Sequence, residues 1–122
     1  MLQKESIVNV TDNSGAKQLR IIGIPGHSKQ KFARVGEIVT GAVHGAQPGG
    51  TVANKQKVKG LIVRARKEKR RSDGSYVRFD DNAVVIVDKD GNPLGTRVFG
   101  PVAREVRDRG YTKITSLATE VW

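Results

Sequence analysis

The stretch of sequence that decides the fold reads Val58-Lys59-Gly60-Leu61-Ile62-Val63-Arg64-Ala65-Arg66. Its centre is continuously apolar over a length typical of one strand, and a second run of this kind, Ala83–Val87, follows later in the chain. Continuous apolar runs are typical of strands that are covered on both faces, so we place both runs in the core of a β-structure. We expect almost complete burial for at least two of the following four side chains: Leu61, Val63, Val85 and Val87.

The rest of the chain favours strands as well. Val occurs 16 times and Ile 8 times, against 5 Leu and 9 Ala, and β-branched side chains suit a pleated surface. Turn signals built from Gly, Asn, Asp and Pro recur at short intervals, which predicts a small barrel or sandwich. The predicted strands are Ser6–Val10, Leu19–Ile24, Glu37–Val43, Val58–Arg66, Tyr76–Phe79, Ala83–Val87 and Thr96–Phe99.

The pattern changes after Phe99. Pro101 stands near a predicted helix start, Val102 and Val106 have helical spacing, and the helix should end by Gly110. Periodicity does not decide between strand and helix for Lys113–Leu117. We further expect Asn9 to mark the wetter face of the first strand, and Phe79 and Phe99 to lie in the core.

Length and composition restrict the class of protein. A chain of 122 residues is expected to form one domain, residues 1–122, with a hydrophobic core large enough to be stable without cross-links. It has no Cys, which excludes disulfides, thiolate metal sites and Cys nucleophiles. It has no apolar run long enough to span a bilayer and no apolar segment of a signal peptide near Met1. We therefore expect a soluble protein without a membrane partner.

Positive charge is concentrated in one block of the chain. The formal net charge is +10; residues 17–71 hold 14 bases and two acids, whereas residues 1–16 and 72–122 each sum to −1. Such a block indicates a polyanionic partner. Nucleic acid is the first choice, with an anionic membrane surface or a solvated charged face as the alternatives.

The strongest local signal is a basic hairpin that turns at Asp73-Gly74, with Arg64–Arg71 in its first arm. Strand alternation would put Arg64 and Arg66 on one face. Arg can bind two phosphate oxygens and Lys acts as a point charge, although bases also protect exposed strand edges. The predicted RNA-binding residues are Lys29, Lys31, Arg34, Lys55, Lys57, Lys59, Arg64, Arg66, Lys67, Lys69, Arg70, Arg71 and Arg78.

Other chemistry has little support. Six aromatic residues form no alternating array with bases, so recognition through phosphate, sugar and shape is favoured over reading of bases. The segment Gly45–Thr51 resembles a phosphate-binding loop but lacks its Lys, and reads as a loop between strands. His27 and His44 are the only histidines and both stand in Gly-flanked loops, so exposed or phosphate-contacting histidines are favoured over a two-His metal site. Asp88–Asn92 reads as a turn. We expect no metal, no cofactor and no enzymatic activity.

Several collinear motifs resemble the universal large-subunit ribosomal protein L-fourteen family, of the bacterial type. The resemblance covers the whole chain. It rests on Gly60–Val63 and its spacing to Asp73-Gly74, Phe79, Asn82 and Val85-Ile86, and on three further segments: Asp12–Ala16, Gly95–Glu105 and Lys113-Ile114 with Ser116–Ala118.

The resemblance implies a mostly β fold: a closed five-stranded β-barrel with a projecting β-ribbon hairpin and a C-terminal part with short helices. It implies a structural constituent of the large ribosomal subunit that binds large-subunit rRNA at the subunit interface. Implied partners are small-subunit rRNA across an inter-subunit bridge, ribosomal proteins three and nineteen, and the ribosomal silencing factor, which Thr96, Arg97 and Lys113 would contact. The implied location is the ribosome of the cytoplasm, or of an organelle that encodes this protein.

The sequence departs from the family pattern in two places. Lys55-Gln56 stands where the family has a Gly-Asp turn, so a positive φ would fall on Asn54 or cost strain. Thr119 replaces a Pro.

The rival functions are a free RNA-binding factor, a DNA-architectural protein and an RNA-directed enzyme. The Asp12–Gly15 turn reads as mainly architectural.

Overall fold

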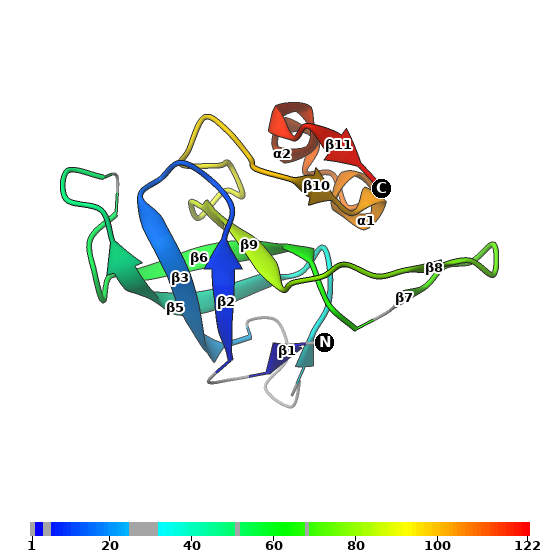
Figure 1. The fold of residues 1–122 in the computed structure, drawn as a ribbon, viewed down its shortest axis with the longest axis horizontal. Helices are drawn as coiled ribbons and strands as arrows, with labels where there is room; N and C mark the ends of the chain where they lie inside the picture. The colour runs from blue at the N-terminus through cyan, green and yellow to red at the C-terminus, as the bar shows by residue number, and fades with distance from the viewer. Residues whose placement is uncertain (1, 4–5, 25–31, 51, 68) are drawn as a thin grey trace.

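The computed structural model describes residues 2–3, 6–24, 32–50, 52–67 and 69–122 (Figure 1). Its strands are β1 (Leu2–Gln3), β2 (Ile7–Val10), β3 (Ala16–Gly23), β4 (Phe32–Ala33), β5 (Ile38–Ala46), β6 (Lys57–Arg64), β7 (Lys69–Arg70), β8 (Tyr76–Val77), β9 (Ala83–Val87), β10 (Pro101–Val102) and β11 (Glu120–Val121). Its helices are α1 (Arg104–Asp108) and α2 (Thr112–Leu117).

Five of the strands form a closed barrel in the order β2-β3-β5-β6-β9, which confirms the expected architecture. The neighbouring strands are antiparallel except at the seam, where β2 runs parallel to β9 with Asn9 opposite Ala83. β7 and β8 form a ribbon that projects from the barrel (Figure 1). β10 and β11 pair in parallel beside the two helices, and β1 pairs with β4.

The barrel interior is organised around Leu19 of β3. A Cβ built on Gly41 of β5 would lie 2.6 Å from Leu19 Cγ and 2.7 Å from the backbone oxygen of Arg20. A Cβ on Gly60 of β6 would lie 3.0 Å from Leu19 Cδ2. The two glycines therefore leave the space that the fully buried Leu19 fills. This packing requires glycine for close approach rather than for an unusual backbone angle.

The two central strands are covered on both faces, as their sequence predicts. Gly60, Ile62 and Val84 face the barrel interior, and Leu61 and Val85 lie on the opposite face by strand alternation. All the residues of these apolar runs are buried, and the four side chains expected in the core are at most 2% exposed. The C-terminal segment, residues 100–122, covers the outer face of these strands with buried side chains. It joins β6 through a 3.0 Å hydrogen bond from Ala103 N to Val63 O.

The predicted strand Thr96–Phe99 is wrong. The backbone N–H groups of Thr96 and Arg97 donate to Asn13 Oδ1 at 2.7 and 3.1 Å, so a side chain takes the place of a neighbouring strand. Of these residues only Val98 forms a bridge, to Asp12. Phe99 is consequently half exposed instead of lying in the core.

The C-terminal helices differ in detail from the prediction. Pro101 and Val102 form β10, and the first helix begins at Arg104 and ends at Asp108, before Gly110 as expected. The ambiguous segment Lys113–Leu117 lies in α2. The expectations for Asn9, which is exposed, and Phe79, which is buried, are confirmed.

Replacing Gly41 by Ala should lower the free energy of unfolding by about 1–3 kcal/mol, because the new methyl group meets Leu19 and a backbone oxygen. Urea denaturation of the purified protein measures this change. Gly23→Ala in β3 is the control, since no heavy atom lies within 4 Å of its Cβ position. Equal stability of the two variants would contradict the packing role of Gly41.

Candidate nucleic-acid interface

The predicted RNA-binding residues divide by their exposure. Those with exposed side chains are Arg34, Lys55, Lys57, Lys59, Arg66, Lys67, Arg70 and Arg78. Lys29 and Lys31 lie outside the described residues, and so does the side chain of Lys69. The remaining two, Arg64 and Arg71, bind other parts of the protein.

Arg64 does not face solvent, which corrects its assignment as a phosphate-binding residue. It is 7% exposed; its Nε donates to Asp81 Oδ1 at 3.0 Å and its Nη2 to Asp81 Oδ2 at 3.2 Å. Its Nη1 donates to the backbone oxygens of Phe99 and Pro101 at 3.0 and 3.2 Å. β6 ends at Arg64, and Arg64 is buried whereas Arg66 is exposed, so the predicted shared face does not form.

Gly100 makes room for this guanidinium. Its φ of 80° lies in the left-handed region, and a Cβ at this position would collide with Arg64 Nη1. The Gly100 backbone thus brings the carbonyl groups of Phe99 and Pro101 to the same nitrogen atom.

Arg71 is also engaged within the protein. Its Nε donates to Glu105 Oε1 of α1 at 2.8 Å, and both side chains are largely buried. Its Nη2 donates to the backbone oxygen of Trp122. Arg71 therefore fastens the ribbon to the C-terminal segment, which corrects its assignment to the RNA-binding set.

The ribbon turns at Asp73-Gly74, as predicted. Asp73 Oδ1 accepts hydrogen bonds from the Ser75 hydroxyl at 2.6 Å and the Ser75 N–H at 3.0 Å, and the hydroxyl bond is the main cause that lowers the Asp73 pKa. Gly74 supplies the positive φ that the turn requires. Lys69 pairs with Val77 and Arg70 with Tyr76. The turn thus fixes the register of the ribbon, and with it which basic side chains share a face.

The outer barrel wall adds two exposed bases that sequence analysis did not single out, Lys17 and Arg20 of β3. Arg20 and Lys57 both pair in register with Ala42, which lies between them on β5. Residues in register share a face, so Arg20 and Lys57 flank a small side chain on the outer wall. Both bases belong to the basic block 17–71, which is the signal that could have found them.

The β5–β6 loop has its strained position at Lys55, with a φ of 65°, rather than at Asn54. Asn54 Oδ1 instead accepts a 3.0 Å hydrogen bond from Gly45 N, which fixes the loop against β5. A left-handed residue with a side chain costs about 1–2 kcal/mol relative to the right-handed region. The Lys-Gln departure therefore places an exposed cation on a strained turn.

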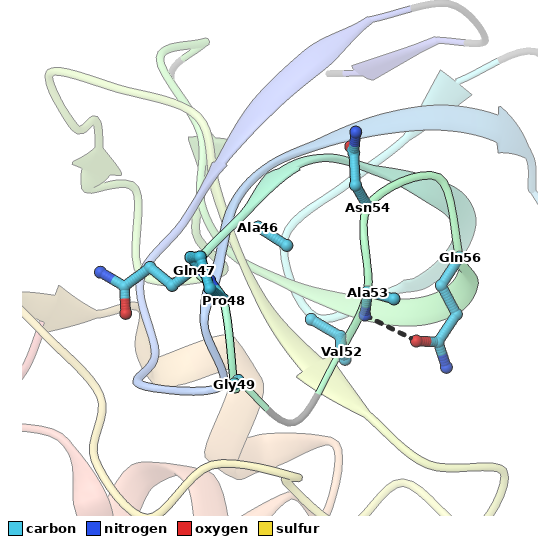
Figure 2. Close-up of a pocket in the computed structure, with 9 residues that line it drawn as sticks. Ala46, Gln47, Pro48, Gly49, Val52, Ala53, Asn54 and Gln56 are labelled. Carbon is cyan, nitrogen blue, oxygen red and sulfur yellow. Dashed lines mark hydrogen bonds between the residues drawn. The ribbon is translucent and has the colours of Figure 1, made fainter.

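A hollow of about 380 Å³ lies beside this loop. Figure 2 shows the residues that line it. Its side chains are uncharged, and the 2.9 Å hydrogen bond from Ala53 N to Gln56 Oε1 holds its rim. The residues that line it are Ala46, Gln47, Pro48, Gly49, Gly50, Val52, Ala53, Asn54 and Gln56. The segment joins two strands, as expected, and the lining offers no cation to a phosphate.

The Asp12–Gly15 turn is built into the barrel seam. Asp12 Oδ1 accepts from the Ser14 hydroxyl and N–H, and Oδ2 accepts from Ile86 N at 2.9 Å, where β2 has ended. Burial is the main cause that raises the pKa of Asp12 above its ordinary value of 3.8, and the hydrogen bonds oppose it. Protonation at this group favours the folded state, so its contribution to stability falls as pH rises from 3.8 through the raised folded pKa.

Asn13 positions two of the predicted protein-contact residues, a role that sequence analysis missed. Its Oδ1 accepts from the backbone of Thr96 and Arg97, and its Nδ2 donates to Thr96 Oγ1 at 2.8 Å. Lys113 Nζ on α2 donates to Asn92 Oδ1 at 3.3 Å, which links α2 to the same loop. Thr96, Arg97 and Lys113 are all exposed.

The family model described as Ribosomal protein L14p/L23e matches residues 1–122. The chain belongs to the L14p/L23e family. It is therefore a structural constituent of the large ribosomal subunit, acts in the ribosome and binds rRNA. The L14p/L23e family is a class of structural rather than enzymatic proteins.

In the described part of this L14p/L23e chain, the His, Asp and Glu side chains form no group of three that could hold a metal ion. Neither α1 nor α2 is long and apolar enough to cross a membrane.

Arg64→Gln should lower the free energy of unfolding by about 2 kcal/mol, because hydrogen bonds from a charged donor to Asp81 and to two backbone oxygens are lost. Arg66→Gln, two residues away and exposed, is the matched control and should change stability by less than about 0.5 kcal/mol. Urea denaturation compares the two variants. Equal losses would show that Arg64 has no special structural role.

Proposed function

We propose that the chain holds rRNA through two exposed basic surfaces. The barrel surface consists of Arg34, Lys55, Lys57 and Lys59, and the ribbon surface consists of Arg66, Lys67, Arg70 and Arg78. The observation that carries this proposal is the separation of these solvent-facing bases from Arg64 and Arg71, whose guanidinium groups bind the protein itself. Lys29, Lys31 and Lys69 stay in the proposal on their sequence positions.

Exposed Arg and Lys side chains suit the RNA backbone. Arg can donate to two phosphate oxygens, and Lys supplies a mobile point charge. Contacts of this kind fix the orientation of the protein and neutralise phosphates without reading bases. The rigid barrel beneath Lys57 and Lys59 presents both charges from one strand, β6, on the side away from the core. The ribbon extends the basic area beyond the barrel (Figure 1).

A single domain spanning residues 1–122 fits this role. The barrel, the ribbon and the C-terminal segment are joined through Arg64 and Arg71, and the buried side chains form one hydrophobic cluster. RNA bound at the ribbon would thus act on the same body as RNA bound at the barrel.

The position at the subunit interface is proposed from the family resemblance. It includes an inter-subunit bridge to small-subunit rRNA and contacts with ribosomal proteins three and nineteen. Exposed residues at the loop between β9 and β10, on the side with α2, offer a surface apart from the ribbon (Figure 1).

The silencing factor is proposed to dock at Thr96, Arg97 and Lys113. Two observations support this proposal: all three side chains are exposed, and Asn13 holds the backbone of the first two in a defined conformation. Two cations there suit an acidic partner surface, where rim charges mainly raise the association rate. A factor seated on the interface side would block the small subunit sterically.

RNA binding should show strong salt dependence. The logarithm of the affinity should fall linearly with the logarithm of salt, by roughly 0.7–0.9 for each phosphate neutralised. Replacing Arg66, Lys67, Arg70 and Arg78 by Gln should reduce this slope by about three in a salt titration with an rRNA fragment. Lys89→Gln with Arg107→Gln is the control outside both basic surfaces. An unchanged slope in the fourfold variant would mean that the ribbon surface faces solvent or protein.

Arg97→Ala with Lys113→Ala should weaken binding of the silencing factor in a salt-sensitive manner, while incorporation into large subunits continues. Surface plasmon resonance at several salt concentrations measures the first effect, and sedimentation of subunits measures the second. Arg104→Ala with Arg107→Ala removes the same charge from α1 and serves as the control. Failed incorporation of the Arg97 and Lys113 variant would assign this surface to rRNA.

A further inference from the structure

The ribbon has two different faces, and its register defines them. Arg70 lies opposite Tyr76, so these side chains share one face, and Arg78 follows two residues after Tyr76 on that side. Arg71 and Val77 lie on the other face. We call Arg70, Tyr76 and Arg78 the outer ribbon face.

The opposite face is attached to the protein. Arg71 pairs with Glu105 of α1 at 2.8 Å, Val77 is 8% exposed, and Phe79 packs against Trp122 with 6.0 Å between ring centroids. These contacts fix the ribbon against the C-terminal segment. The outer ribbon face is consequently held in one orientation relative to that segment.

The outer ribbon face carries an aromatic ring between two guanidinium groups. Tyr76 is 63% exposed, the highest value among the exposed large hydrophobic side chains of the described residues. Arg70 and Arg78 are exposed as well. The ring makes no contribution to the core. An exposed ring suits a ligand with an aromatic surface, and the two guanidinium groups suit a ligand with negative charge.

We infer that the outer ribbon face binds an unpaired nucleotide of RNA, with its base stacked on Tyr76 and its flanking phosphates bound by Arg70 and Arg78. The inference rests on the proposed rRNA contact and adds the state of the RNA that the ribbon recognises. A base in a duplex has both of its faces covered by neighbouring pairs, whereas an unstacked base offers one to an aromatic ring. Two cations beside the ring favour a nucleotide over an apolar peptide segment.

This assignment refines the expectation that recognition through phosphate, sugar and shape is favoured over reading of bases. That expectation rested on the scarcity of aromatics and on their spacing in the sequence. Cross-strand pairing brings Arg70 beside Tyr76 although five residues separate them along the chain. Stacking on a Tyr tolerates any base, so the site would select unpaired RNA without selecting a sequence.

The test compares two RNA probes with the full-length protein. One is a single-stranded adenosine oligomer of about 12 nucleotides, within the site size of single-strand binders, that carries one 2-aminopurine. The other is an RNA duplex of the same length. Tyr76→Leu keeps an apolar side chain but removes the ring, Tyr76→Phe keeps the ring, and Phe99→Leu is the control at another exposed aromatic residue.

We expect Tyr76→Leu to weaken single-strand binding about tenfold, to reduce quenching of 2-aminopurine, and to change duplex binding by less than about twofold. Tyr76→Phe and Phe99→Leu should bind both probes like the parent. The salt dependence should stay the same in Tyr76→Leu, because no charge is lost.

Two outcomes would overturn the inference separately from the proposed function. If the parent binds both probes with strong salt dependence and Tyr76→Leu binds them equally well, the basic surfaces stand and the stacking site is wrong. An equal loss on both probes would likewise reject selection of unpaired RNA. If the parent binds neither probe at low salt, the proposed RNA contact of the basic surfaces fails together with this inference.

Discussion

One buried guanidinium group holds the parts of this molecule together. Arg64 stands where β6 leaves the barrel; it binds Asp81, which precedes β9, and the carbonyl groups on both sides of Gly100, where the C-terminal segment begins. Three segments distant in sequence thus share one side chain. Because a guanidinium carries five N–H donors in a rigid plane, it fixes directions as well as distances. The start of the C-terminal segment is thereby fixed against the barrel.

This arrangement determines which of the positive charges face solvent. Arg64, Arg66 and Arg71 belong to the same basic stretch of the sequence. In the structure, however, Arg64 binds Asp81 and backbone oxygens, and Arg71 binds Glu105. Arg66 and Arg70, their neighbours in the sequence, remain exposed. Net charge alone therefore overstates the charge that RNA can reach, and the useful quantity is the exposed charge on a fixed surface.

Sequence patterns predicted the fold well where local chemistry decides it. The apolar runs at 60–63 and 83–87 indicated strands covered on both faces, and the Asp-Gly turn indicated the hairpin. The errors lie where distant partners decide. Thr96–Phe99 has strand-like residues, but the N–H groups of Thr96 and Arg97 donate to the Asn13 side chain, 83 and 84 residues away. Arg64 resembles its neighbours, and its burial depends on Asp81, 17 residues further on. The same holds for the candidate site, because exposure follows from tertiary contacts that charge patterns do not contain.

The parallel seam between β2 and β9 has a consequence for how the molecule is made. The bond between Asp12 and Ile86 spans 74 residues, and the strand pairing beside it spans a similar distance. A chain synthesised from its N-terminus cannot close this barrel until most of its length has left the site of synthesis. Until then β2 presents an unpaired edge to other chains. Such non-local closure makes folding slow compared with a helical protein of the same size, so the interval before closure is the period in which nascent chains most need protection from aggregation.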